Sequence, residues 1–175
     1  MNYYSIIMTK LEQFSLDALD FLLLNQLQSD ASASNQTLAR TVHISAATCL
    51  RRVKRLRDAG LIERQVALLD ANRIAQHVGH GLTAIVEITL DRQGDEAAVA
   101  FEQRIAPDSA VQQCYRVSPG PDFVLVVHAG DMPGYLALAQ RLFTSDANVR
   151  NVKAFFSLKR SKFDPKLPLV RRTDS

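Results

Sequence analysis

The sequence lacks tryptophan and contains only two cysteines, Cys49 and Cys114, among its 175 residues. Because the two thiols lie far apart in segments that we assign to different domains, they predict neither a disulfide framework nor a metal site, and they favour a reducing, cytoplasmic setting. No apolar run is longer than Phe123–Val127, whereas a membrane-spanning helix needs about 20 apolar residues. The first residues also lack a basic segment followed by an apolar one, so we expect no signal peptide.

The sequence also has little excess charge of either sign, because 21 Lys or Arg residues nearly balance 18 Asp or Glu residues and leave a net charge of +3. Hydrophobic residues make up 47% and charged residues 22% of the chain, which is ordinary for a folded globular protein and excludes a disordered or collagen-like chain. The basic residues are nevertheless unevenly distributed. Six of them, against two acidic residues, fall between Ser45 and Arg64, so a surface that binds a polyanion is expected there.

The first third of the chain has the apolar spacing of three short helices separated by turns. The predicted helices are Leu16–Gln28, Asn35–Val42 and a third that runs from the N-cap residue Ser45 to Ala59 and stops at Gly60. Two helices joined by a tight turn and braced by a third form the helix-turn-helix arrangement.

The third helix has two faces of opposite chemistry when its residues are placed about 100° apart. The apolar arc contains Ala46, Cys49, Leu50, Val53 and Leu56. The other side is mostly basic and is predicted to face outward and dock into a duplex groove, where an arginine fork reaches guanine or clamps a phosphate. The predicted DNA-binding residues are Ser45, Thr48, Arg51, Arg52, Lys54 and Arg55. A solvated basic face without a partner is the alternative.

The second half alternates strand and helix patterns in the order β-α-β-β-α-β. The expected strands are Leu82–Leu90, Ala110–Val117, Asp122–Ala129 and Val149–Arg160, and the expected helices are Asp95–Ile105 and Asp131–Phe143. This order predicts a ferredoxin-like antiparallel sheet with both helices on one face. The expected fold class is therefore α+β, with an N-terminal winged helix-turn-helix domain and a C-terminal ferredoxin-like domain.

The strand Asp122–Ala129 contains a stretch that is apolar on both sides, although the predicted sheet has helices on only one face. A strand of that kind requires cover on both faces, and no further element of the chain is left to supply it. We therefore predict that a second copy covers the open face in a two-fold dimer. Two recognition helices would then read DNA half-sites about 34 Å apart, or a multiple of that spacing.

Taken in order, the motifs of the chain resemble those of the Lrp/AsnC (feast/famine) family of transcriptional regulators. The resemblance rests on Leu16-Asp17 with Asp20, Leu38-Ala39, Ile44-Ser45, Cys49–Leu56, Ala59–Ile62, Val86–Leu90, Val117-Ser118 with Asp122-Phe123, and Lys166–Leu169. It implies a sequence-specific DNA-binding regulator whose C-terminal domain senses a small effector, expected to be an amino acid. It also implies homodimers that assemble further, up to octamers, with effector binding tuning the oligomeric state or the affinity for DNA.

The resemblance places the effector at the turn between the second and third strands of the sensing domain, at an interface between subunits. The residues expected to bind it are Ser118, Gly120, Asp122 and Met132. Asp122 would pair with an α-ammonium group, and the amide of Ser118 or Gly120 would bind the carboxylate. Pro119 stands where the family has glycine, so backbone contacts to the effector would be rearranged. A purely structural Asp122 that caps the turn is the alternative.

Five segments are expected along the chain. They are an N-terminal extension (1–15), a helix-turn-helix domain (16–64), a linker (65–81) with a short helix at Ala71–His77, a ligand-sensing and oligomerisation domain (82–160), and a C-terminal tail (161–175). Within the extension, Met8 is an alternative to Met1 as the start of translation. His43 occupies a turn position where the family usually has glycine, which requires this histidine to adopt a positive φ.

Other chemistry is weakly represented. His77 and His80 have no further ligand nearby in the sequence, and no catalytic triad or carboxylate pair stands out, so we expect no enzyme, cofactor or metal. One alternative is an enzyme like the tetrapyrrole side-chain decarboxylases that share this two-domain architecture, although the His- and Tyr-containing run expected between Cys114 and Phe123 is missing. The other alternative is a protein-interaction adaptor.

Overall fold

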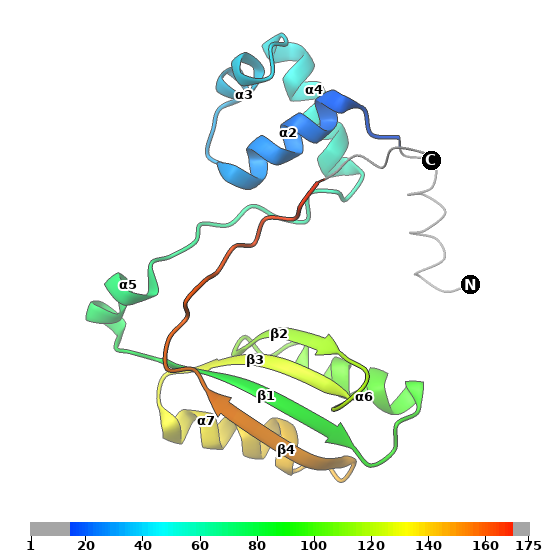
Figure 1. Ribbon diagram of the computed structural model, residues 1–175, viewed down its shortest axis with the longest axis vertical. Coiled ribbons are helices and arrows are strands. Elements are labelled where there is room, and N and C mark those ends of the chain that lie inside the picture. The colour runs from blue at the N-terminus through cyan, green and yellow to red at the C-terminus, as the bar shows by residue number, and fades with distance from the viewer. Residues whose placement is uncertain (1–14, 170–175) are drawn as a thin grey trace. The chain divides into compact units, whose positions relative to one another are not determined.

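The computed structural model describes residues 15–169, so most of the predicted extension, including Met8, lies outside the described residues. The chain divides into two compact units (Figure 1). The described residues up to Leu68, together with those from Phe163 onward, form one, which we call the helical unit. Leu69–Lys162 form the other, which we call the sheet unit. None of the helices in the described part of the chain is both long and apolar enough to cross a membrane.

The helical unit contains the three predicted helices. They are α2 (Ala18–Ser29), α3 (Asn35–Thr41) and α4 (Ala46–Asp58). Each begins after a side chain that accepts the backbone N–H three residues on, which satisfies a donor that the helix itself leaves unpaired. The pairs are Asp17 with Asp20 (2.9 Å), Ser34 with Thr37 (3.2 Å) and Ser45 with Thr48 (3.2 Å). The helix-turn-helix fold and the N-cap predicted at Ser45 are confirmed.

Two positive φ angles shape the ends of α4. His43, in the turn between α3 and α4, has φ 55°, as predicted, and Gly60 has φ 75°. At Gly60 the N–H donates to the Arg57 carbonyl (2.9 Å) and the next N–H, that of Leu61, donates to the Leu56 carbonyl (3.1 Å). This pattern is a Schellman motif, in which a left-handed residue lets the last carbonyls of the helix find donors.

The core of the helical unit is small and gathers on the inner sides of all three helices. Its buried apolar members are Leu23, Leu24, Leu38, Ala39, Val42, Cys49, Val53 and Leu56. Leu50, which the helical spacing places in the apolar arc of α4, is instead 55% exposed. The segment expected to be a tail also contributes, because Leu169 packs against this core and Leu167 exchanges two hydrogen bonds with the Gln28 side chain (2.6 and 3.2 Å).

The sheet unit has the predicted ferredoxin-like order of elements. After a short helix, α5 (Ala71–Val78), come β1 (Leu82–Leu90), α6 (Asp95–Ile105), β2 (Val111–Arg116), β3 (Phe123–Ala129), α7 (Met132–Ala139) with a π-helical turn η1 (Gln140–Thr144), and β4 (Val149–Phe156). The strands form one antiparallel sheet in the order β2-β3-β1-β4 (Figure 1). Residues from β1, β3, α6, α7 and η1 share one buried cluster, so both helices lie on the same face of the sheet.

The last strand is shorter than expected. β4 ends at Phe156, not at Arg160, and Leu158 is fully exposed. The neighbouring strand explains the difference, because Phe156 pairs with Ala84 and β1 begins only two residues before Ala84. The Ser157 N–H makes one further bond, to the Thr83 carbonyl (2.8 Å), and the pairing then stops because β1 begins at Leu82.

The second face of the sheet, which we call the open face, is only partly polar. Its apolar side chains are Ile85, Tyr115, Val124, Val126 and Phe155, of which Ile85, Tyr115 and Phe155 are 44%, 53% and 49% exposed. The register brings them together, because Val126 pairs with Ile85 and Ile85 pairs with Phe155 on the next strand. Glu87 and Lys153, 3.7 Å apart, lie beside this patch.

Candidate nucleic-acid interface

The predicted DNA-binding side chains of α4 fall into two groups. Arg51 and Lys54 are exposed; Arg51 makes no hydrogen bond or ion pair within residues 15–169, and Lys54 pairs only along its own helix, with Asp58 (2.6 Å). Ser45 and Thr48 lie at the start of the helix, where their hydroxyl groups are 2.8 Å apart. Arg52 and Arg55 behave differently, since both are directed at carboxylates of α2 and its N-cap.

Four side chains form what we call the Asp-Arg cluster: Asp17, Asp20, Arg52 and Arg55. The Arg52 Nη1 atom lies 2.7 Å from Asp17 Oδ2 and 2.9 Å from Asp20 Oδ1. Arg55 Nη2 donates to the other oxygen of Asp20, Oδ2. Asp20 is completely buried, whereas the side chains of Arg52 and Arg55 are 21% and 45% exposed. The cluster therefore joins α2 to α4 through one carboxylate that has no access to solvent.

The capping box of α2 holds the two carboxylates in place. Asp17 accepts the Asp20 N–H (2.9 Å) and the Asp20 carboxylate accepts the Asp17 N–H (3.1 Å). The hydrogen bond from the Asp20 N–H, together with the bond from Arg52, holds the pKa of Asp17 below its usual range against a smaller opposing effect of burial. The carboxylates of Asp17 and Asp20 likewise raise the pKa of Arg52.

Sequence reasoning missed the cluster because it counted charge only between Ser45 and Arg64. The acids that neutralise Arg52 lie 32 and 35 positions earlier in the chain. A signal was present, since Asp20 occupies the same helical face as Leu16, Leu23, Leu24 and Leu27. An acidic residue within an apolar stripe is rarely left without a cationic partner.

The predicted effector turn lies at one end of β3. Ser118, Pro119 and Gly120 are exposed, the Ser118–Pro119 peptide is cis, and Gly120 has φ 125°. Asp122 is half-buried and its carboxylate accepts the Leu90 N–H at 2.7 Å, while its own N–H donates to the Ile88 carbonyl at 2.9 Å. Asp122 therefore ties the turn to the end of β1, which is a structural role whatever else it binds.

Met132 does not join the other predicted effector residues within one chain. It follows β3, whereas Ser118–Asp122 precede β3. A strand rises about 3.3 Å per residue, so the seven residues of β3 separate the two places by about 20 Å. A site that contains all four residues therefore needs more than one copy of the chain.

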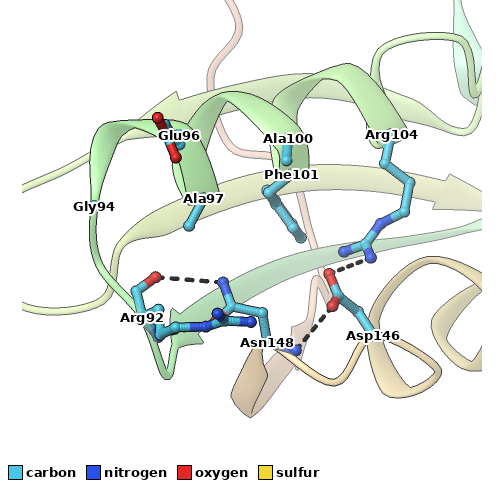
Figure 2. Close-up of a pocket in the computed structure, with 9 residues that line it drawn as sticks. All are labelled: Arg92, Gly94, Glu96, Ala97, Ala100, Phe101, Arg104, Asp146 and Asn148. Carbon is cyan, nitrogen blue, oxygen red and sulfur yellow. Dashed lines mark hydrogen bonds and ion pairs between the residues drawn. The ribbon is translucent and has the colours of Figure 1, made fainter.

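A cavity of about 570 Å³ lies elsewhere in the sheet unit, against α6 (Figure 2). Its lining residues are Arg92, Gly94, Glu96, Ala97, Ala100, Phe101, Arg104, Asp146 and Asn148. The Arg104 guanidinium stacks over the Phe101 ring (5.2 Å to the centroid) and pairs with Asp146. Because Asp146 already neutralises this cation, and none of the predicted effector residues lines the cavity, we assign no ligand to it.

Metal binding finds no support in the part of the chain that the structure describes. No group of three or more His, Cys, Asp or Glu side chains is arranged there as metal ligands. The two cysteines are separate free thiols, buried at Cys49 and exposed at Cys114.

Two family models match this chain and together cover most of it. The model described as "Winged helix-turn-helix DNA-binding" matches residues 16–63, and the "Lrp/AsnC ligand binding domain" matches residues 83–167. The first corresponds to the helices that carry the Asp-Arg cluster and the second to the four-stranded sheet. The name of the first model implies a wing, which would be formed by the extended segment after α4. Residues 61–69 of that segment form no strand ladder.

Several transcriptional regulators are similar to this chain over nearly their full length. An uncharacterized HTH-type transcriptional regulator of Haemophilus influenzae is 35% identical over 86% of this chain and 87% of its own length. The DNA-binding transcriptional activator DecR of Escherichia coli is 32% identical over 88% and 99%. Among solved structures, a transcriptional regulator of Neisseria meningitidis in complex with L-Met superposes with a TM-score of 0.76 at 27% identity over 88% and 97%. Each of these relatives is named as a transcriptional regulator, and none is named as a decarboxylase.

Proposed function

The chain belongs to the Lrp/AsnC family of DNA-binding transcriptional regulators, and from that premise we propose that it recognises specific operator sites through α4 and responds to a small effector, an amino acid. The observation that carries the proposal is the exposed side of α4, where Arg51 and Lys54 carry positive charge. A helix-turn-helix protein lays the start of its second helix in the major groove, where arginine can bind guanine edges or phosphates. A regulator of this kind works where the DNA is, so we also place it in the cytoplasm.

The contacts with the duplex are assigned to α4 and its N-cap. Arg51 and Lys54 supply unburied positive charge, and Thr48 lies one turn before Arg51 with a hydroxyl that can donate or accept. Ser45 caps the helix with its own hydroxyl, so its role is to begin the helix at this point as well as to lie near a phosphate. Arg52 and Arg55 already pair with carboxylates in the Asp-Arg cluster.

The open face of the sheet supports a homodimer. In a single copy Ile85 and Phe155 would remain exposed to water and Val126 would remain half-buried. Burying apolar area stabilises an association by about 25 cal/mol per Å². A two-fold axis would place the patch of one copy on the same patch of the other and would present two copies of α4 to DNA. Assembly of such dimers into octamers remains a prediction from the family.

The effector site is proposed at the turn Ser118–Asp122, completed by a neighbouring copy. The exposed backbone of Ser118 and Gly120 is accessible to a carboxylate, and Asp122 offers a charge for an α-ammonium group. The relative solved with L-Met supports an amino acid as the class of ligand. Met132, beyond the opposite end of β3, would contribute only from a different copy of the chain.

DNA binding is tested with genomic fragments selected by the wild-type protein. The Arg51→Gln variant should bind the selected sites about tenfold or more weakly, since a direct base or phosphate contact is worth about 1–3 kcal/mol. Arg150→Gln, an exposed arginine on β4, is the matched control and should bind normally. Wild-type affinity in both Arg51→Gln and Thr48→Ala, measured at one salt concentration, would contradict the proposed interface.

Effector binding is tested by titrating the dimer with single amino acids, L-Met and L-Leu included, in a calorimeter. One or more should bind and change the mass of the assembly or its affinity for DNA. Asp122→Asn keeps an oxygen that can accept the Leu90 N–H but removes the charge, so it should fold normally and lose the response. A variant that responds as the wild type does would remove Asp122 from the site.

A further inference from the structure

Two arginines of α4 pair with a carboxylate of α2, whereas Arg51 and Lys54 do not. Arg52 and Arg55 are three residues apart and both donate to Asp20 on α2, whereas Arg51 and Lys54 on the same helix make no bond to α2. We propose that Asp20 is a positioning residue, which holds Arg52 and Arg55 against α2 and out of the phosphate contacts so that α4 presents Arg51 and Lys54 to the duplex. This inference rests on the proposed function, because it assumes that α4 binds DNA.

The burial of Asp20 favours arginines that stay paired with it over arginines that turn to the DNA. Its side chain is 0% exposed, and its oxygens accept from Arg52 Nη1 (2.9 Å), from the Asp17 N–H (3.1 Å) and from Arg55. If one arginine moved to a phosphate, the buried Asp20 carboxylate would lose one of its cationic partners. The free-energy penalty of that loss is larger than the stabilisation that an exposed ion pair with a phosphate provides. The two arginines therefore stay with Asp20 when DNA arrives.

Arg52 is held more tightly than a surface pair would be. It binds two carboxylates at once, at 2.7 and 2.9 Å, and its Nε atom is buried without a hydrogen-bond partner among residues 15–169. A guanidinium fixed at both Asp17 and Asp20 also fixes how α4 is rotated about its axis relative to α2. That rotation decides which side chains of α4 face a groove.

The salt dependence of DNA binding distinguishes an arginine that is paired with Asp20 from an arginine that contacts a phosphate. The logarithm of the binding constant falls with the logarithm of salt concentration by about 0.9 for each phosphate that a cation neutralises. An arginine that contacts a phosphate reduces that slope when it is replaced by glutamine, while an arginine held by Asp20 does not. A loss of folding changes the fraction of active protein but not the slope.

The experiment compares three Arg→Gln variants on one helix with the wild-type dimer, on one selected duplex over a range of NaCl concentrations. Arg51→Gln should bind about tenfold or more weakly. Arg52→Gln and Arg55→Gln should keep the wild-type slope, even where a loosened contact between α2 and α4 lowers their affinity for DNA. All measurements are made at a temperature at which the circular dichroism of the variant matches that of the wild type. A slope reduced by about 0.9 per engaged helix in Arg52→Gln or Arg55→Gln would overturn the inference.

Asp20→Asn is the reciprocal variant, since it keeps the size of the side chain and removes its charge. It should release the two arginines, steepen the slope by up to about 1.8 per engaged helix and lower the ratio of specific to random-sequence affinity. A folded Asp20→Asn protein with the wild-type slope would also overturn the inference. If that variant fails to fold, the Arg52→Gln and Arg55→Gln slopes still decide.

The results separate this inference from the proposed function. A wild-type protein that binds no duplex would overturn the proposed function, and the inference with it. A wild type that binds, with a reduced slope in Arg52→Gln or Arg55→Gln, would leave the regulator intact and overturn only the role of Asp20.

Discussion

The two units of the chain differ in what they bury. In the helical unit a charged carboxylate, Asp20, lies at 0% exposure among leucines. In the sheet unit no charged side chain among those described is fully buried, and the core is made of apolar residues from the strands and helices. The helical unit leaves charge on its surface at α4, while the sheet unit leaves apolar area on its open face.

This difference agrees with the kind of partner that we propose for each unit. Ion pairs are directional, so a buried one can hold a helix at a defined rotation, which a DNA-reading helix requires. Apolar contact is non-directional and grows with area, which suits a broad surface that covers a second copy of itself.

The open face should be the most sensitive place in the sheet unit. Val126→Asp would put a carboxylate on each side of the proposed two-fold interface, so the dissociation constant of the dimer should rise at least a hundredfold, which is about 3 kcal/mol. Analytical ultracentrifugation measures this directly. Val99→Asp, on α6 where Val99 is 42% exposed, is the matched control and should leave the dimer intact. Dissociation by both variants, or by neither, would contradict the assignment of the interface.

A smaller effect is expected at the end of α4. Gly60 has φ 75°, and an added Cβ would meet nothing within 4 Å. Gly60→Ala should therefore lower the free energy of unfolding of the helical unit by about 1 kcal/mol through backbone strain alone. Gly130→Ala, equally open but without a positive φ, should change the stability of the sheet unit by less than about 0.5 kcal/mol. Chemical denaturation with probes in each unit measures both, and equal losses would refute the strain argument.

The smallest effect concerns acid stability. Because the pKa of Asp17 is lower in the folded chain than in the unfolded one, its contribution is present above about pH 4 and is lost as the pH falls through the lower, folded-state value. Asp17→Asn keeps a side chain that caps helices well but removes this titration. Its free energy of unfolding should fall less between pH 5 and pH 2 than that of the wild type, by under about 1 kcal/mol for this half-exposed pair. Parallel pH curves for the two proteins would contradict the assigned cause.

Local pattern was sufficient for most elements of secondary structure. The strand Leu82–Leu90 and the helix Asp95–Ile105 have the bounds that alternation and helical spacing predict. Ser45 begins α4 because its hydroxyl accepts a backbone donor three residues away. These features depend on neighbours within a few positions, which is the range over which sequence patterns carry information.

Sequence pattern predicted less well those features that depend on which elements pack against one another. Helical spacing placed Leu50 inside, but the two adjacent helices cover a narrower arc of α4 than the apolar residues occupy. The expected end of the last strand depended on where its partner begins. The bounds of the five expected segments and the individual site residues remain predictions.

The amino-acid sequence by itself determined the three short helices with their caps, the order of strands and helices in the second half, and the family motifs, since each arises from residues close together in the chain. Only the tertiary structure decided that Asp20 would pair with Arg52 and Arg55, and that Leu167 and Leu169 would return to α2 and its core. Those contacts join residues 32 to 139 positions apart. The packing of whole elements decides which distant groups come into contact. A buried charge then pairs with a group of opposite charge that this packing places close to it.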